Sequence, residues 1–203
     1  MPRVYCIDGI TPVVDPSAYV HPSAVLIGDV IVAARAYIGP CACLRGDFGR
    51  IVVEEGANIQ DSCLLHGFPG KDTVVGREAT VGHGAVLHGC VVRRGALVGM
   101  NAVVNDNAEI AEDAVVAALA FVKAEQKIPP RTLVAGIPAR ALRTLSDQEL
   151  SWKNDNTLLY QALARRSAAG MREVEALSAV EPDRKRIDIP GAVPLSELKA
   201  AKR

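Results

Sequence analysis

Large aliphatic residues recur at every sixth position along much of the chain, and this period dominates its hydrophobic pattern. The repeating positions are Val32, Ile38, Leu44, Val53, Ile59, Leu65, Val75, Val81, Leu87, Val98, Val104, Ile110 and Val116. An amphipathic helix needs a period of about 3.6 residues, which a six-residue spacing does not supply. The pattern instead predicts hexapeptide repeats, in which each step is a short strand and a turn. Three steps would close one triangular coil of about 18 residues.

The period divides the chain into four segments. We expect an N-terminal strand segment over 1–13, a β-helix over 14–122, a connector and C-terminal helix over 123–170, and a tail over 171–203. A loop at 66–72, HGFPGKD, interrupts the coils. Ser146 and Glu149 form a capping box that opens an amphipathic helix running to about residue 169. The predicted fold is therefore an all-β solenoid, a parallel β-helix of hexapeptide repeats with a C-terminal α-helix.

Composition narrows the classes of function. The 203 residues carry 23 basic and 23 acidic side chains, so no net field attracts nucleic acid or an anionic membrane. No apolar stretch reaches the roughly 20 residues of a membrane span, and the N-terminus lacks a signal-peptide pattern. Five cysteines without a CxxC pair suit a reducing compartment. We expect a cytoplasmic protein that binds neither nucleic acid nor membrane.

Three histidines fall at related positions of the repeat. His66 follows Leu65 and His88 follows Leu87, so both occupy the same step of their coils. Their separation of 22 residues equals one coil plus a four-residue insertion in the loop after His66. The two imidazoles should therefore stack one above the other. His83 belongs to the preceding face, around a corner, so one chain does not readily bring all three together.

Three imidazoles form a sufficient ligand set for a catalytic zinc ion that keeps a water in its fourth position. Iron or cobalt would also accept these ligands. If one subunit supplies His66 and His88 and its neighbour supplies His83, a three-fold arrangement creates three identical sites. The sequence therefore predicts a homotrimer with metal sites between subunits.

Polar residues lie near these histidines. Gln60 is a candidate for the chemistry, because an uncharged amide beside a metal can orient its solvent or a bound carbonyl. Arg45 and Asp47 could form a salt bridge within or between chains, which Asp61 is positioned to join. We assign Arg45, Asp47 and Asp61 to assembly of the trimer.

Several motifs together resemble those of the γ-class carbonic anhydrase-like family. They are RGDFGR, NIQD, HGFPGKDTVVG, VGHGAVLHGC and GMNAVV, with SDQELSWKNDNTLLYQ in the helix and EPDRKRI in the tail. The similarity extends over nearly the whole chain and is greatest to the PaaY and CaiE group within that family. It implies a left-handed β-helix, a homotrimer, and a zinc site at each interface built from His66, His88 and a neighbour's His83.

The resemblance also implies roles for other residues. Arg45 and Asp47 would make subunit contacts, Gln60 would lie beside the metal-bound solvent, and Asn58 and Asp61 would belong to the same polar cluster. Tyr160 matches a family tyrosine near the site. The chain departs from the family at its acidic proton-shuttle residues, since Phe48 stands where a glutamate is expected.

PaaY-like proteins are associated with hydrolysis of a CoA thioester in phenylacetate degradation, so the resemblance favours a zinc-dependent thioesterase. A CoA thiolate leaves readily without a proton donor, which is compatible with the missing glutamate. Three alternatives stay open. They are a true γ-carbonic anhydrase acting on CO2 and bicarbonate, a hexapeptide acyltransferase with a histidine as general base, and a metal-stabilised assembly module without catalysis.

Overall fold

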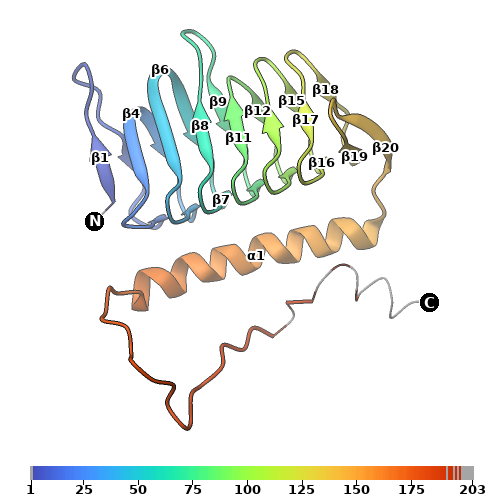
Figure 1. Ribbon diagram of the computed structural model, residues 1–203. Coiled ribbons are helices and arrows are strands. Elements are labelled where there is room, and N and C mark those ends of the chain that lie inside the picture. Colours follow the sequence, from blue (N-terminus) through green and yellow to red (C-terminus); the bar gives the residue numbers. More distant parts are fainter. Residues whose placement is uncertain (1, 191, 194, 196, 198–203) are drawn as a thin grey trace.

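The computed structural model describes residues 2–190, 192–193, 195 and 197, and these form a left-handed parallel β-helix flanked by one long helix (Figure 1). Three ladders of strands make the three faces of the solenoid. The first face contains β1 (Arg3–Tyr5), β8 (Leu64–His66), β11 (Val86–His88), β14 (Val103–Val104) and β17 (Phe121–Val122). The second contains β2 (Val13–Val14), β9 (Thr73–Val75), β12 (Val91–Val92), β15 (Glu109–Ile110) and β18 (Lys127–Ile128).

Two long strands connect these faces. β4 (Val25–Val32) and β6 (Cys43–Val53) each run through the first face, turn the corner and continue in the second. The third face contains β3 (Tyr19–Val20), β5 (Tyr37–Ile38), β7 (Asn58–Ile59), β10 (Thr80–Val81), β13 (Leu97–Val98), β16 (Val115–Val116), β19 (Thr132–Ala135) and β20 (Arg140–Thr144). All of the strand pairs are parallel except β19 with β20, which close the last coil as an antiparallel pair.

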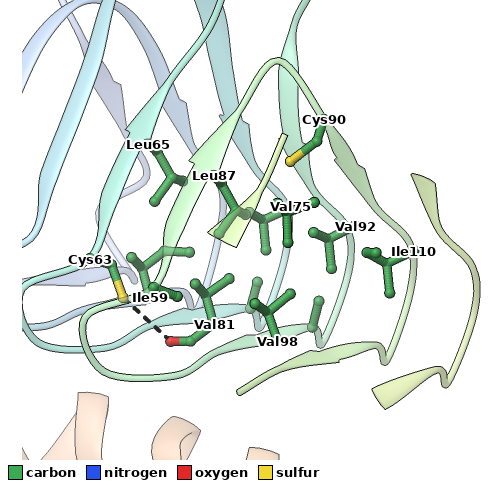
Figure 2. Packing of buried hydrophobic residues seen from close by; sticks show 14 of the residues in the cluster. Ile59, Cys63, Leu65, Val75, Val81, Leu87, Cys90, Val92, Val98 and Ile110 are labelled. Atoms are coloured by element: carbon green, nitrogen blue, oxygen red, sulfur yellow. Dashed lines mark hydrogen bonds between the residues drawn. The ribbon is translucent and has the colours of Figure 1, made fainter. Parts of the chain in front are cut away.

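The repeating aliphatic residues fill the interior of the solenoid. Figure 2 shows Leu65 and Leu87 stacked on neighbouring coils, with Val81 and Val98 from another face pointing into the same interior. All four are fully buried. Alanine or cysteine occupies the corners, as at Ala85 and Cys63, because a larger side chain would not fit where two faces meet. The hexapeptide prediction is confirmed.

The corners themselves require an unusual backbone. The residue before the small corner residue often has a positive φ, for example 58° at Ser62, 55° at Asn101 and 57° at Asp113. Asparagine and aspartate tolerate this region better than most residues. The coils also approach closely at the ends of strands: a Cβ on Gly99 would lie 2.5 Å from the backbone nitrogen of Ala118. Several corners therefore have a residue that tolerates a positive φ, and glycine stands where the backbones of two coils approach closely.

Parallel pairing extends past Val122, where we expected the β-helix to end. β18 pairs with β15, and β19 pairs with β16. Ile128 and Val134 take inward positions and are buried. They continue the six-residue spacing of Val116 and Val122. The first part of the segment expected to be a connector is thus a further part of the β-helix.

Helix α1 (Asp147–Gly170) begins at the capping box predicted from Ser146 and Glu149. It starts beside β20 at the C-terminal end of the solenoid and runs back along the third face, where it packs on β3, β5 and β7 (Figure 1). Buried Lys153 fastens it by donating to the Gly95 carbonyl and, at 3.0 Å, to Asp113. Residues 171–190 form no helix or strand and are exposed, and they lead back beneath the helix (Figure 1).

Candidate metal centre

His66 and His88 lie one above the other on the first face. They end β8 and β11 and are direct partners in the parallel ladder. Their rings face each other, with Nδ1 of His66 3.0 Å from Nε2 of His88. Two ligands of one tetrahedral zinc ion, each about 2.0–2.1 Å from the metal, would lie about 3.3 Å apart. The stacking expected from the repeat thus brings two imidazole nitrogens to a spacing that a shared zinc ion requires.

A carboxylate holds the other nitrogen of each ring. Oδ1 of Asp47 lies 3.1 Å from Nε2 of His66, and Oδ1 of Asp106 lies 2.6 Å from Nδ1 of His88. Each carboxylate accepts the ring N–H, which leaves the facing nitrogen with its lone pair. Carboxylates commonly orient metal-binding histidines in this way. Asp106 is absent from the residues singled out in the sequence, although it follows His88 by 18 residues, one coil of the repeat.

The surroundings of His66 favour its neutral form. Burial lowers the pKa of this imidazole below its ordinary value, and the charge of the Arg45 guanidinium lowers it further. Arg45 donates to Oδ2 of Asp47 at 2.8 Å. Desolvation raises the pKa of Asp47, but this hydrogen bond and the charge of Arg45 outweigh it and bring the net pKa below the usual value. A neutral imidazole next to an ionised carboxylate is the state that binds a metal.

His83 lies on a different corner of the solenoid, with its own carboxylate. Its Nδ1 is 3.0 Å from Oδ2 of Asp61, and its Nε2 is 3.4 Å from the hydroxyl of Tyr160 on α1. Asp61 therefore pairs with His83 and not with Arg45 and Asp47, because the strand that precedes it belongs to the third face. All three histidines consequently share one feature, a carboxylate that holds one ring nitrogen, while the second nitrogen contacts an uncharged partner.

Gln60 belongs to the same corner as His83. Its Oε1 accepts a hydrogen bond from the backbone N–H of His83 at 3.2 Å, and its Nε2 donates to Asn58 at 3.1 Å. Asn58 in turn donates to Thr80 at 2.8 Å, so this buried polar chain is satisfied. Gln60 thus lies apart from His66 and His88 within one subunit. It would approach them only as part of the subunit that contributes His83.

Tyr160 connects α1 to this corner. Its ring packs against Tyr37, with ring centroids 5.6 Å apart. Burial raises the pKa of Tyr160 to about 12, and the charge of Asp61 adds to the effect. The phenol therefore stays protonated at neutral pH and can act as a hydrogen-bond donor.

The relatives of the chain agree with its hexapeptide architecture. It is 55% identical to the carnitine operon protein CaiE of Escherichia coli O1:K1 over 183 residues, which are 90% of this chain and 93% of that protein. The chain belongs to the CaiE family.

Two solved structures are similar to this CaiE-family chain. A Bacillus cereus protein assigned to the acetyltransferases superposes with a TM-score of 0.82 at 30% identity, covering 83% of this chain and 98% of its own. A hexapeptide transferase family protein from Anaplasma phagocytophilum gives a TM-score of 0.78 at 35% identity, covering 81% and 97%. No model of a protein family matches the sequence. The names of both similar proteins are those of transferase enzymes, and their structures support the β-helix fold of this chain.

A complete ligand set does not form within one subunit of this CaiE-family chain. In the part of the chain that the structure describes, no three His, Cys, Asp or Glu side chains come together as a metal site. His66 and His88 form a half-site on one corner, and His83 presents its Nε2 on another. The donor set fits zinc, since imidazoles with carboxylate partners suit that ion.

Two exposed phenylalanines flank the His66–His88 pair. The ring of Phe48 lies 5.5 Å from that of His66, and Phe68 of the loop meets His88 edge-on at 5.1 Å. They are 61% and 49% exposed. An apolar rim around the half-site is suited to contact with another subunit or with an apolar substrate.

Among the described residues, no helix is long and apolar enough to span a bilayer.

Proposed function

We propose that the chain is a zinc-dependent hydrolase of CoA thioesters that works as a homotrimer. One subunit would supply His66 and His88, and the partner subunit's His83 would complete each site. The observation that carries this proposal is the arrangement shared by the three histidines. Each has one ring nitrogen held by an aspartate. The other nitrogen faces the paired histidine in His66 and His88, and the Tyr160 hydroxyl at 3.4 Å in His83, and a metal ion would take the place of these contacts.

A zinc ion bound by three imidazoles activates water near neutral pH and polarises a carbonyl group. The protein's own residues supply the rest. Asp47, Asp61 and Asp106 fix the tautomers of the histidines, which keeps the ligand nitrogens available. Gln60, whose Oε1 accepts from the backbone N–H of His83, would orient the attacking water or the thioester carbonyl. Tyr160, which stays protonated, would donate a hydrogen bond to the oxygen that gains negative charge.

The absence of a proton-shuttle glutamate favours a thioester over CO2 as the substrate. Phe48 occupies that position, and its side chain has no group that can accept or donate a proton. CO2 hydration at high speed requires rapid export of a proton, whereas a thiolate leaves without first being protonated. We therefore expect carbonic anhydrase activity to be slow or absent. The CaiE relatives come from a carnitine operon and give no support to phenylacetate metabolism, so the acyl group must be sought separately.

The test uses freshly purified, full-length protein. We expect about one zinc ion per subunit, a trimeric mass, and hydrolysis of acyl-CoA that stops with a chelator and returns on adding zinc. Iron and cobalt loading should be compared, because both accept three imidazoles. Hydrolysis that is unaffected by metal removal would contradict the proposal. Rapid CO2 hydration by the metal-loaded protein would identify a carbonic anhydrase instead.

A second candidate is a hexapeptide acyltransferase. The similarity to the Bacillus cereus protein supports it, and His88 with Asp106 resembles a general base oriented by a carboxylate. Such an enzyme would release CoA only when an amine or alcohol acceptor is present, and would need no metal. Product analysis by mass spectrometry with and without an acceptor separates the two candidates. A metal-bound trimer with no turnover under either condition would favour an assembly module.

A further inference from the structure

A cavity of about 470 Å³ lies between α1 and the outer side of the third face. Its floor is aliphatic: Leu97, Val115 and Leu133 are register partners on β13, β16 and β19. Trp152 and Asn156 of α1 form part of the opposite wall. Sites for small organic ligands commonly have volumes of about 300–1,000 Å³ and apolar walls. This cavity has the size and lining of a ligand site.

The helix leaves this part of the face uncovered. Toward the N-terminal coils, α1 packs directly on the outward residues, with Tyr160 against Tyr37 and the Thr157 hydroxyl 3.3 Å from that of Thr80. The next outward position is Leu97, where the aliphatic row and the cavity begin. A row of aliphatic residues beside a helix would normally be filled by helix side chains. Here it remains open to a ligand.

One end of the cavity is the proposed catalytic corner. Gln60, His83 and Tyr160 all line it, and the aliphatic floor leads away from them. A ligand whose carbonyl group lies at His83 would therefore place whatever follows that carbonyl against Leu97 and Val115. In a thioester, one of the two groups attached to the carbonyl carbon is the acyl substituent.

The charged groups at the other end are already paired. Arg143 makes two hydrogen bonds to Glu149, at 2.8 and 2.7 Å. Lys153 donates to the Gly95 carbonyl and to Asp113. Among the described residues that line the cavity, Arg143, Glu149 and Lys153 are the Arg, Lys, Asp or Glu side chains. A charged ligand would have to break these pairs, whereas an uncharged apolar ligand would not.

We propose that this cavity binds the acyl group of the substrate, and that this group is uncharged and apolar. The inference rests on the proposed thioesterase function, and it names the substrate class of the same site. Leu97 and Val115 would determine specificity by limiting how long or wide the acyl group can be. The CoA portion would leave the site on the other side of the carbonyl, toward the subunit interface.

The test compares kcat/KM for CoA thioesters of increasing apolar length in the zinc-loaded trimer. We expect hexanoyl and phenylacetyl thioesters to be hydrolysed at least about tenfold more efficiently than acetyl thioester, since a buried methylene in an apolar pocket can be worth roughly tenfold or more. A thioester ending in a trimethylammonium group should be at least about tenfold poorer than its uncharged tert-butyl analogue.

Val115→Phe should fill the cavity without disturbing the core, because Val115 points outward from the solenoid. We expect a loss of at least about tenfold on the hexanoyl thioester and less than about twofold on the acetyl thioester. Val91→Phe places the same side chain at an outward position of the second face and should change neither. Leu97→Ala should instead improve the bulkier substrates relative to wild type. Zinc content and trimer mass should match the wild type in all three variants.

Two kinds of failure can be told apart. If thioesters are hydrolysed but efficiency does not depend on the acyl group, or Val115→Phe affects all lengths equally, the acyl-site inference is wrong and the proposed function stands. If no thioester is hydrolysed, the proposed function fails. Calorimetry with 2-oxoheptyl-CoA, the non-hydrolysable thioether analogue of hexanoyl-CoA, then decides the inference separately. Binding that weakens in Val115→Phe but not in Val91→Phe supports it, and equal or absent binding overturns it.

Discussion

Asp106 holds His88 from the next coil of the solenoid, with its Oδ1 2.6 Å from Nδ1 of the ring. Asp106 lies one coil after His88, and His66 lies one coil before it. The carboxylate of Asp106 therefore fixes the orientation of the His88 ring from the side opposite His66. Nε2 of His88 is thereby directed at His66. Asp106 is a positioning residue for the proposed metal site.

Replacing this carboxylate should weaken metal binding. For Asp106→Asn we expect a loss of about 10- to 100-fold in zinc affinity, the usual effect of removing an outer partner of a metal-binding histidine. Competition with a fluorescent chelator measures the change. Asp29→Asn is a matched control, because Asp29 pairs with Arg50. Equal affinities in the two variants would contradict the role given to Asp106.

Subunit complementation tests whether the site is shared. His83→Ala and His66→Ala trimers should each bind no zinc at these sites. Co-expressed at equal levels, about three quarters of the trimers would contain both kinds of subunit, and each of these would have one intact site of three. Zinc content and hydrolysis should then recover to about one quarter of the wild-type values. A site confined to one chain would show no recovery.

The buried tyrosines should make the fold sensitive to alkali. Burial, with the charge of Asp61, raises the pKa of both Tyr37 and Tyr160 to about 12. The folded state therefore keeps these protons more tightly than the unfolded chain, whose tyrosines titrate near pH 10. Their contribution to stability is complete below pH 10 and is lost as the pH rises toward 12.

Urea unfolding between pH 9 and 12 measures this dependence. In a Tyr37→Phe, Tyr160→Phe double variant, the free energy of unfolding should fall less steeply over that interval than in the wild type. The comparison should be made with chelator present in both samples, so that loss of metal does not contribute. Identical slopes would show that other groups control the alkaline transition.

The ion pair beneath α1 predicts unequal effects for its two partners. Lys153 is 2% exposed, whereas the Asp113 side chain keeps some contact with solvent at 25%. Asp113→Asn keeps a residue that tolerates the φ of 57° but leaves a buried ammonium group without its counter-ion, and it should cost about 3 kcal/mol in the free energy of unfolding. Lys153→Met removes the buried charge itself and should cost only about 1 kcal/mol. Glu112→Ala, at an exposed neighbour, should stay within about 0.5 kcal/mol of wild type. A greater cost for Lys153→Met than for Asp113→Asn would refute this account.

The solenoid could be predicted because one inward residue per step leaves a direct record in the sequence. The positions of Leu65 and Leu87 were sufficient to align His66 with His88, since a parallel ladder fixes register over its whole length. The end of the β-helix was predicted too early, at Val122, although Ile128 and Val134 continue the six-residue period. Handedness left no such record and came from family resemblance.

The site was less accessible to sequence reasoning than the fold. Asp61 follows a third-face strand, so the corner on which it lies, and its pairing with His83, depend on counting faces as well as coils. Asp106 carries an 18-residue offset from His88, a signal that a search for histidines alone overlooks. The acyl cavity depends on how far α1 stands from Leu97 and Val115, and the packing of a helix on a sheet has no periodic signature.

Stacked coils also restrict how this chain can change its length in evolution. Neighbouring strands are about 4.8 Å apart, so an extra coil inserted between His66 and His88 would double their separation and destroy the half-site while leaving a stable solenoid. The same insertion beyond the coil of Asp106 would leave the ligands in place. Added or deleted repeats should therefore be tolerated toward the ends of this family's β-helix and excluded from its centre.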